Sequence, residues 1–268
     1  VAFVTARRLP PERKPTVSSS SRHLFFRSSL PAEQSYRVPK DAYDCLLQTQ
    51  LPCKIELVSS ISRENPPSLT LRKVAASDIP SVVEMCDREY GTGPAVFPLD
   101  NPLLITDWVD RQLFRSLVDW TTHLKLFGKN DDYAVIVAST NDNEIVGMVE
   151  VSLQPILPER NPPPYPIPLA LKRTFCSLTR IPLQGWITNL LVVPEHRGRG
   201  YSKLLVAACE RMARKDWKVQ SVHLHCDAAS DGCVAQRLYD RLGYQRILPD
   251  CIVRVQGVQL LYLYKDLF

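Results

Sequence analysis

The residues with the clearest chemical potential form a glycine-rich turn between a predicted strand and a predicted helix. The turn reads Arg197-Gly198-Arg199-Gly200-Tyr201-Ser202, and Lys203 follows in the helix. Glycines let a ligand approach the main chain closely, and the first amide groups of a helix lack intrahelical partners, so such a turn can bind phosphate. Its spacing fits neither a P-loop nor a dinucleotide-binding fingerprint. The turn therefore predicts another phosphorylated ligand, and a purely structural tight turn remains the alternative.

A second set of side chains could accept a proton. The predicted strand 219–227 has a period of two, which places His223, His225 and Asp227 on one face. Histidine suits the deprotonation of an amine because its ordinary pKa is about 6.5. The alternative is a solvent-facing pair of histidines without a chemical role. No metal site is predicted, because a third ligand is not evident and the eight cysteines lack metal-binding spacing.

The segments around these residues alternate between strand and helix patterns. Strands are predicted at 69–74, 133–139, 144–153, 185–193, 219–227 and 258–265, and helices at 79–90, 105–127, 202–215 and 233–242. The helix 105–127 carries an apolar stripe that is expected to face the core, formed by Val109, Leu113, Leu117, Trp120 and Leu124. Residues 155–168 contain seven prolines and are predicted to be a loop, which together with 169–184 forms an insertion of about thirty residues before the strand 185–193.

Two sequence motifs, at the separation that the family shows, resemble those of the GCN5-related N-acetyltransferase (GNAT) superfamily. The first is Arg197-x-x-Gly200-x-Ser202, which is similar to that family's R/Q-x-x-G-x-G/A acetyl-CoA motif with serine at the last position. The second is Ala235-x-x-Leu238-Tyr239-x-x-Leu242-Gly243-Tyr244, which is similar to the family's late helix. The resemblance covers residues 69–265. It implies a mixed α/β (α+β) fold with a twisted, mostly antiparallel sheet flanked by helices.

The resemblance also implies roles for particular residues. Tyr239 falls where the family places the general acid that protonates the departing CoA thiolate, and packing of the helix is the alternative role. His225 or Asp227 falls near the position of a catalytic glutamate in some members. The implied acetyl-CoA contacts come from the strand before the turn and from the turn itself: Leu190, Leu191, Val192, Arg197, Gly198, Arg199, Gly200, Tyr201, Ser202 and Lys203. The asparagine that many members carry before the late helix is missing from 228–233, so that contact is unassigned.

The acceptor is predicted from weaker features. The segments 147–153 and 187–190 look most like the plastid branch of the superfamily, whose members acetylate protein N-termini and lysines. A protein or peptide amine is therefore the leading acceptor. A small-molecule amine acetyltransferase is one alternative, with Glu150, Glu159 and Asp107 as the only hints of an acidic groove. A non-catalytic acetyl-CoA sensor is the other, although such a domain would not need Tyr239.

Charge and composition bear on partners and location. The 268 residues have a formal net charge of +5, but residues 1–40 contain eight Lys and Arg against two Glu, so the remainder is close to neutral. Nucleic acid is therefore not an expected partner, and no stretch is apolar enough to span a membrane. Residues 1–68 are predicted to be a disordered, transit-like basic tail and linker, with the acetyltransferase domain at 69–268. An organelle is expected, a plastid before a mitochondrion, with the cytoplasm as the alternative.

Overall fold

The computed structural model describes residues 36–58, 67–99, 102–127, 132–155, 168–228, 233–247, 252–255 and 258–268. Within these ranges one sheet has the strands β1 Cys53–Glu56, β2 Ser68–Lys73, β3 Tyr133–Ser139, β4 Ile145–Pro155, β5 Leu183–Val192, β6 Ser221–Asp227, β7 Gln245–Arg246, β8 Ile252–Val255 and β9 Val258–Asp266. The helices are α1 Ala42–Leu46, α2 Ile79–Tyr90, α3 Ile105–Phe127, α4 Leu169–Thr179, α5 Tyr201–Arg211 and α6 Cys233–Arg241. None of these helices is long and apolar enough to cross a membrane.

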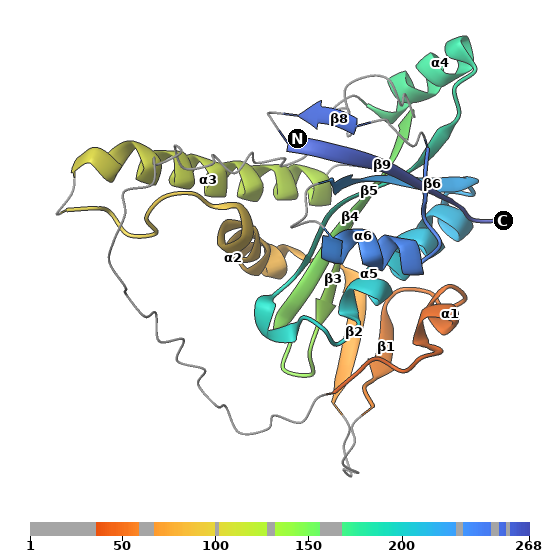
Figure 1. The fold of residues 1–268 in the computed structure, drawn as a ribbon, viewed down its shortest axis with the longest axis horizontal. Coiled ribbons are helices and arrows are strands. Elements are labelled where there is room, and N and C mark those ends of the chain that lie inside the picture. Colours follow the sequence, from red (N-terminus) through yellow and green to blue (C-terminus); the bar gives the residue numbers. More distant parts are fainter. Residues whose placement is uncertain are drawn as a thin grey trace, which may run out of the picture.

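The sheet confirms the predicted fold class. Its strand order is β1-β2-β3-β4-β5-β6-β9-β7, with β8 beside β9, and only β5 and β6 run parallel. Helices α5 and α6 pack against one face of the sheet, and α2 and α3 against the other (Figure 1). Every residue of β4 is buried, because both faces of this central strand are covered.

Helix α5 is the centre of the larger hydrophobic core. Its residues from Leu204 to Arg211 are all buried, and a single turn of π-helix, Met212–Asp216, continues it. Because an apolar helix buried on all sides is held by packing around it, α5 fixes the position of the turn at its N-terminus. The glycine-rich turn therefore stands on a rigid support.

The insertion 155–184 and helix α3 show features that the sequence patterns did not reveal. The second half of the insertion contains α4, whose buried Lys172 pairs with Asp132 at 2.9 Å and bonds the Leu153 carbonyl at 3.1 Å. The residues of the loop from 156 to 167 lie outside the described part. Much of the apolar stripe of α3 is exposed, including Leu113 and Trp120, because the helix packs on the sheet through Val118 instead.

Residues 36–58, which the sequence assigned to the tail and linker, pack against the domain in the structure. Strand β1 pairs with β2 at the edge of the sheet, and α1 lies against α5. The Tyr43 hydroxyl bonds the buried carboxylate of Glu210 on α5, which also pairs with Lys265 at 2.9 Å. Tyr43 and Glu210 are 167 residues apart, so no local pattern could have indicated their contact. Residues 1–35 lie outside the described part.

Candidate active site

The parallel strands β5 and β6 separate partway along their length. Their pairing covers only Gly185 to Ile187 on β5, opposite Val222 to Leu224 on β6, although both strands continue. From Thr188 onward, β5 therefore pairs with β4 alone, and its other edge is free of strand partners among the described residues. A strand edge with free main-chain groups can bind an extended, amide-containing ligand.

A bulge in β5 accompanies this separation. The register with β4 shifts between Met148, opposite Leu191, and Glu150, opposite Thr188. Asn189 lies in the bulge with a φ of 51°, in the left-handed region that asparagine tolerates. Because a bulge bends its strand, it turns the segment Leu190–Val192 away from β6. These are the three strand residues that the family resemblance assigned to acetyl-CoA.

The glycine-rich turn has the geometry that its sequence predicted. Gly198 and Gly200 have φ values of 77° and 93°, and Gly200 is the residue directly before α5. Ser202 and Lys203 lie in the first turn of this helix, where the helix dipole favours an anion. The Lys203 amide donates to the Gly200 carbonyl at 3.1 Å, which leaves the amides before it to face a ligand. The backbone thus offers an anion-binding site of the expected kind.

The two arginines of the turn are partly engaged elsewhere. Arg197 donates to the Val192 carbonyl at 2.8 Å and pairs with Glu89 of α2 at 2.8 Å. Arg199 donates to the Glu195 carbonyl at 3.1 Å. The main chain at Gly198–Ser202 is therefore the principal candidate for anion binding, and the guanidinium of Arg197 also ties the turn to α2.

The segment before α1 supports the turn from the outside. The Val38 amide donates to the Arg199 carbonyl at 3.1 Å. A Cβ atom on Gly200 would approach the Val38 side chain to 3.2 Å, which is tighter than ordinary packing allows. The turn thus has little room to change shape.

Tyr239 lies on α6 and belongs to the hydrophobic core that this helix shares with α5 and β6. Its side chain is buried, and its ring packs edge-on against Tyr244 with centroids 5.4 Å apart. Burial raises the pKa of the Tyr239 hydroxyl well above its ordinary value, and the nearby thiols of Cys226 on β6 and Cys209 on α5 raise it further. The hydroxyl therefore keeps its proton across the physiological range.

The predicted basic face of β6 is covered rather than solvent-facing. His223 is only 7% exposed, and its Nε2 lies 2.7 Å from the Ser221 hydroxyl. The His225 ring packs edge-on against Trp186 of β5, at 4.9 Å between centroids, and lies 5.2 Å from Tyr262 of β9. Burial lowers the pKa of both histidines to about 4, so both are neutral at pH 7. The expectation of a solvent-facing pair is therefore wrong.

Asp227 ends β6, beyond the point where β5 and β6 separate. Its carbonyl accepts a hydrogen bond from Gln236 of α6 at 2.8 Å. His225 and Asp227 thus flank the opening between the strands, whereas His223 lies in the paired region. Neither the roles of these residues nor that of Tyr239 is tested by this geometry, and they stay predictions.

The lowered histidine pKa values predict that the protein loses stability in mild acid. The unfolded chain binds protons near pH 6.5 and the folded chain only near pH 4, so stability is full above about pH 6.5 and falls as the pH drops toward 4. Between pH 7 and pH 5 each histidine is expected to cost about 2 kcal/mol of unfolding free energy. Urea denaturation at both pH values measures this loss. The double variant His223→Gln/His225→Gln should show a clearly smaller pH dependence, and an unchanged one would contradict the prediction.

Glu150 is the site residue whose environment the sequence did not reveal. It lies on β4 opposite Thr188, at the bulge, and is 4% exposed. Both of its carboxylate oxygens lie 3.0 Å from the Lys125 ammonium of α3, and the Tyr133 hydroxyl also bonds it. Its charge is thus compensated by a partner 25 residues away. Two other acidic residues were considered for an acidic acceptor groove. Asp107 lies in the first turn of α3, and Glu159 lies outside the described part.

No group of three or more histidine, cysteine or acidic side chains that could hold a metal ion is found in the described ranges.

A family model described as "Acetyltransferase (GNAT) family" matches residues 99–244 of the sequence. No curated protein sequence matches the chain.

Several solved acetyltransferase structures resemble the fold at low sequence identity. Mutant forms of the spermidine/spermine N-acetyltransferase SpeG from Vibrio cholerae align with 14% identity and a TM-score of 0.45, over 74% of this chain and 94% of theirs. The same enzyme in complex with CoA and spermine aligns with 13% identity and a TM-score of 0.42, over 74% and 95%. Arabidopsis thaliana NAA60 in complex with acetyl-CoA aligns with 16% identity and a TM-score of 0.44, over 74% and 98%.

Proposed function

Because the chain belongs to the GNAT acetyltransferase family and is an N-acetyltransferase of that type, we propose that it transfers acetyl from acetyl-CoA to a protein amine. The acceptor is an N-terminal α-amine, a lysine ε-amine, or both. The observation that carries the proposal is the opening between β5 and β6, which has a buried phenol on the α5 side and a neutral histidine beside it.

The turn suits the pyrophosphate of acetyl-CoA, and the opening between β5 and β6 suits its thioester end. The pyrophosphate would bind the main chain of Gly198–Ser202 at the N-terminus of α5, where the helix dipole favours negative charge. The pantetheine amides would pair with the edge of Leu190–Val192, as an added strand does, beside the Val192 carbonyl that already accepts from Arg197. This arrangement would bring the thioester to the point where β5 and β6 separate.

The reaction then needs one proton removed and one supplied. The acceptor nitrogen attacks the thioester carbonyl carbon, the carbon–sulfur bond breaks, and the sulfur takes the proton of Tyr239 while the amine proton leaves to a base. His225 or Asp227, which flank the opening, would accept that proton directly or through water. Tyr239 suits the acid role because burial keeps it protonated.

At the bulge of β5 itself, the charge does not favour a polyamine. A polyamine carries several positive charges and would need carboxylates free to pair with them. Glu150 lies at the bulge, opposite Thr188, and it is already paired with Lys125 and bonded by Tyr133. The side chains beside β5 and β6 on this face form an aromatic cluster of Trp186, His225 and Tyr262, of which Trp186 and Tyr262 are buried.

Mass spectrometry of acetylated peptides tests the acceptor class. The 268-residue chain is incubated with acetyl-CoA and a mixture of peptides that carry either a free N-terminus or an internal lysine, with spermidine in a parallel reaction. We expect kcat/KM for the best peptide to exceed that for spermidine by about tenfold or more, the cost of one missing charge-assisted hydrogen bond.

Three outcomes separate the alternatives. Acetylated peptides establish a protein acetyltransferase, and the modified positions distinguish α-amines from lysines. Acetylation of spermidine alone would identify a small-molecule enzyme. Binding of acetyl-CoA without transfer to any amine would indicate a sensor domain.

For location we propose an organelle, a plastid before a mitochondrion, with the cytoplasm as the alternative. The support is compositional, because residues 1–40 are rich in Ser and Arg and contain only two acidic residues.

A further inference from the structure

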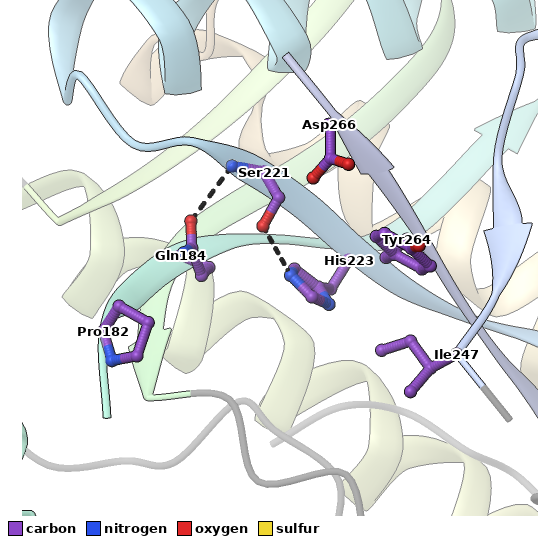
Figure 2. Close-up of a pocket in the computed structure, with 7 residues that line it drawn as sticks. All are labelled: Pro182, Gln184, Ser221, His223, Ile247, Tyr264 and Asp266. Carbon is purple, nitrogen blue, oxygen red and sulfur yellow. Dashed lines mark hydrogen bonds between the residues drawn. The ribbon is translucent and has the colours of Figure 1, made fainter. Parts of the chain in front are cut away.

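A pocket of about 390 Å³ lies on the same sheet face as Trp186 and His225, toward the starts of β5 and β6. Its lining comes from three strands and the segment after β7, and consists of Pro182, Gln184, Ser221, His223, Ile247, Tyr264 and Asp266. In the antiparallel pair β6–β9, Ser221 is opposite Asp266 and His223 is opposite Tyr264. Directly opposite residues share a face, so these four side chains all project toward the pocket (Figure 2).

Hydrogen bonds within the pocket hold its polar side chains in place, but one buried nitrogen atom has no partner among the described residues. The Gln184 side chain accepts a hydrogen bond from the Ser221 amide at 3.0 Å, and Ser221 in turn bonds His223 Nε2. His223 is more than nine-tenths buried, yet its Nδ1 has no hydrogen-bond partner among the described residues. Figure 2 shows this nitrogen pointing away from Ser221, toward the side where Ile247 lies. The hydrogen-bonding capacity of the polar lining is therefore not fully used within the described residues.

The charge of the pocket selects the ligand class. The carboxylate of Asp266 forms no ion pair with any residue in the described ranges, so a cation can approach it. His223 adds no repulsion because burial keeps its ring neutral, and it stacks on Tyr264 with centroids 6.0 Å apart. A free carboxylate beside an aromatic platform is the usual environment for an ammonium or a guanidinium group.

We propose that this pocket is a specificity subsite that binds a lysine or arginine side chain of the acceptor protein, through Asp266, His223 and Tyr264. The proposal rests on the proposed protein substrate and specifies it further. Asp266 lies opposite Ser221, four residues before His225 on β6, which corresponds to about 13 Å along the strand. An extended acceptor covers that distance in about four residues. The basic side chain therefore lies within the first five residues counted from the reactive amine.

Paired peptides test the subsite. Each acceptor peptide carries arginine at one of positions 2 to 5 and is compared with the same peptide carrying citrulline, which has the same shape and no charge. At one or two positions we expect the arginine peptide to have about tenfold higher kcat/KM in the wild-type protein. Asp266→Asn should reduce that ratio to about one, leaving the KM for acetyl-CoA and the rate with citrulline peptides unchanged.

Asp44→Asn is the matched control, because it removes one exposed carboxylate from α1, on the opposite face of the sheet. It should keep the full arginine preference. If peptides are acetylated without any arginine preference, or if Asp266→Asn retains it, the subsite is refuted while the proposed function stands. If no peptide is acetylated, the proposed function fails. Calorimetric binding of the same peptides in the presence of CoA then decides the subsite alone, and equal affinity for both peptides refutes it.

Discussion

Replacing Tyr239 with phenylalanine is expected to lower kcat about 100-fold while leaving the affinity for acetyl-CoA within about twofold of the wild type. General acid catalysis typically contributes a factor of about 10²–10⁴, and phenylalanine keeps the ring while removing the proton. Burial raises the pKa of Tyr239, so loss of its proton should not lower kcat on the alkaline side up to about pH 10. Steady-state kinetics with the best acceptor peptide measures both quantities.

Tyr244→Phe is the matched control for this variant. Tyr244 is buried, and its ring packs against that of Tyr239, so the two substitutions remove one hydroxyl each from the same cluster. Only the first should affect kcat strongly. A donor with a weakly basic leaving group, such as p-nitrophenyl acetate, should narrow the difference between wild type and Tyr239→Phe, because that group departs without a proton. Equal kcat values for Tyr239→Phe and wild type would refute the general acid role.

Replacing Gly200 with valine is expected to raise the dissociation constant for acetyl-CoA about 100-fold. Gly200 has a φ of 93°, which strains any residue with a Cβ atom, and that atom would also press on Val38. The turn must therefore shift, which misaligns the amide groups that would bind the pyrophosphate. Losing two charge-assisted hydrogen bonds of about 1.5 kcal/mol each corresponds to that factor. Isothermal titration calorimetry with acetyl-CoA measures the change.

Gly243→Val separates loss of binding from loss of stability. Gly243 also has a positive φ, of 82°, and a Cβ atom there would meet no other atom within 4 Å. It follows α6 and lies outside the turn, so valine should destabilise the fold through backbone strain without changing the affinity for acetyl-CoA. If both variants bind acetyl-CoA as tightly as the wild type, the turn does not hold the pyrophosphate.

Local patterns predicted the elements that carry the candidate site. The strand predicted at 133–139 and the helix predicted at 105–127 match β3 and α3 in both position and length. The glycines at 198 and 200 are needed because the turn has positive φ values there. Such features depend on residues close in sequence, which is why periodicity and turn chemistry were sufficient.

Helix faces and burial were predicted less well. The stripe of α3 was assigned to the core, but that helix packs on the sheet through Val118 and leaves Leu113 exposed. The histidines of β6 were placed on one face correctly, yet whether that face is covered depends on Trp186 and on β9. An amphipathic pattern shows which residues share a face, and only the neighbouring elements decide what covers it.

The sequence by itself determined the family, the candidate phosphate-binding turn and the choice of Tyr239 as the candidate acid, because these depend on residue types at short, fixed spacings. Only the tertiary structure decided the separation of β5 and β6 and the compensation of Glu150 by Lys125. It also decided the support of Gly200 by Val38 and the pocket at Asp266. Each of these features arises where segments distant in the chain meet, and the geometry of such contacts is set by the packing of the whole sheet and its helices.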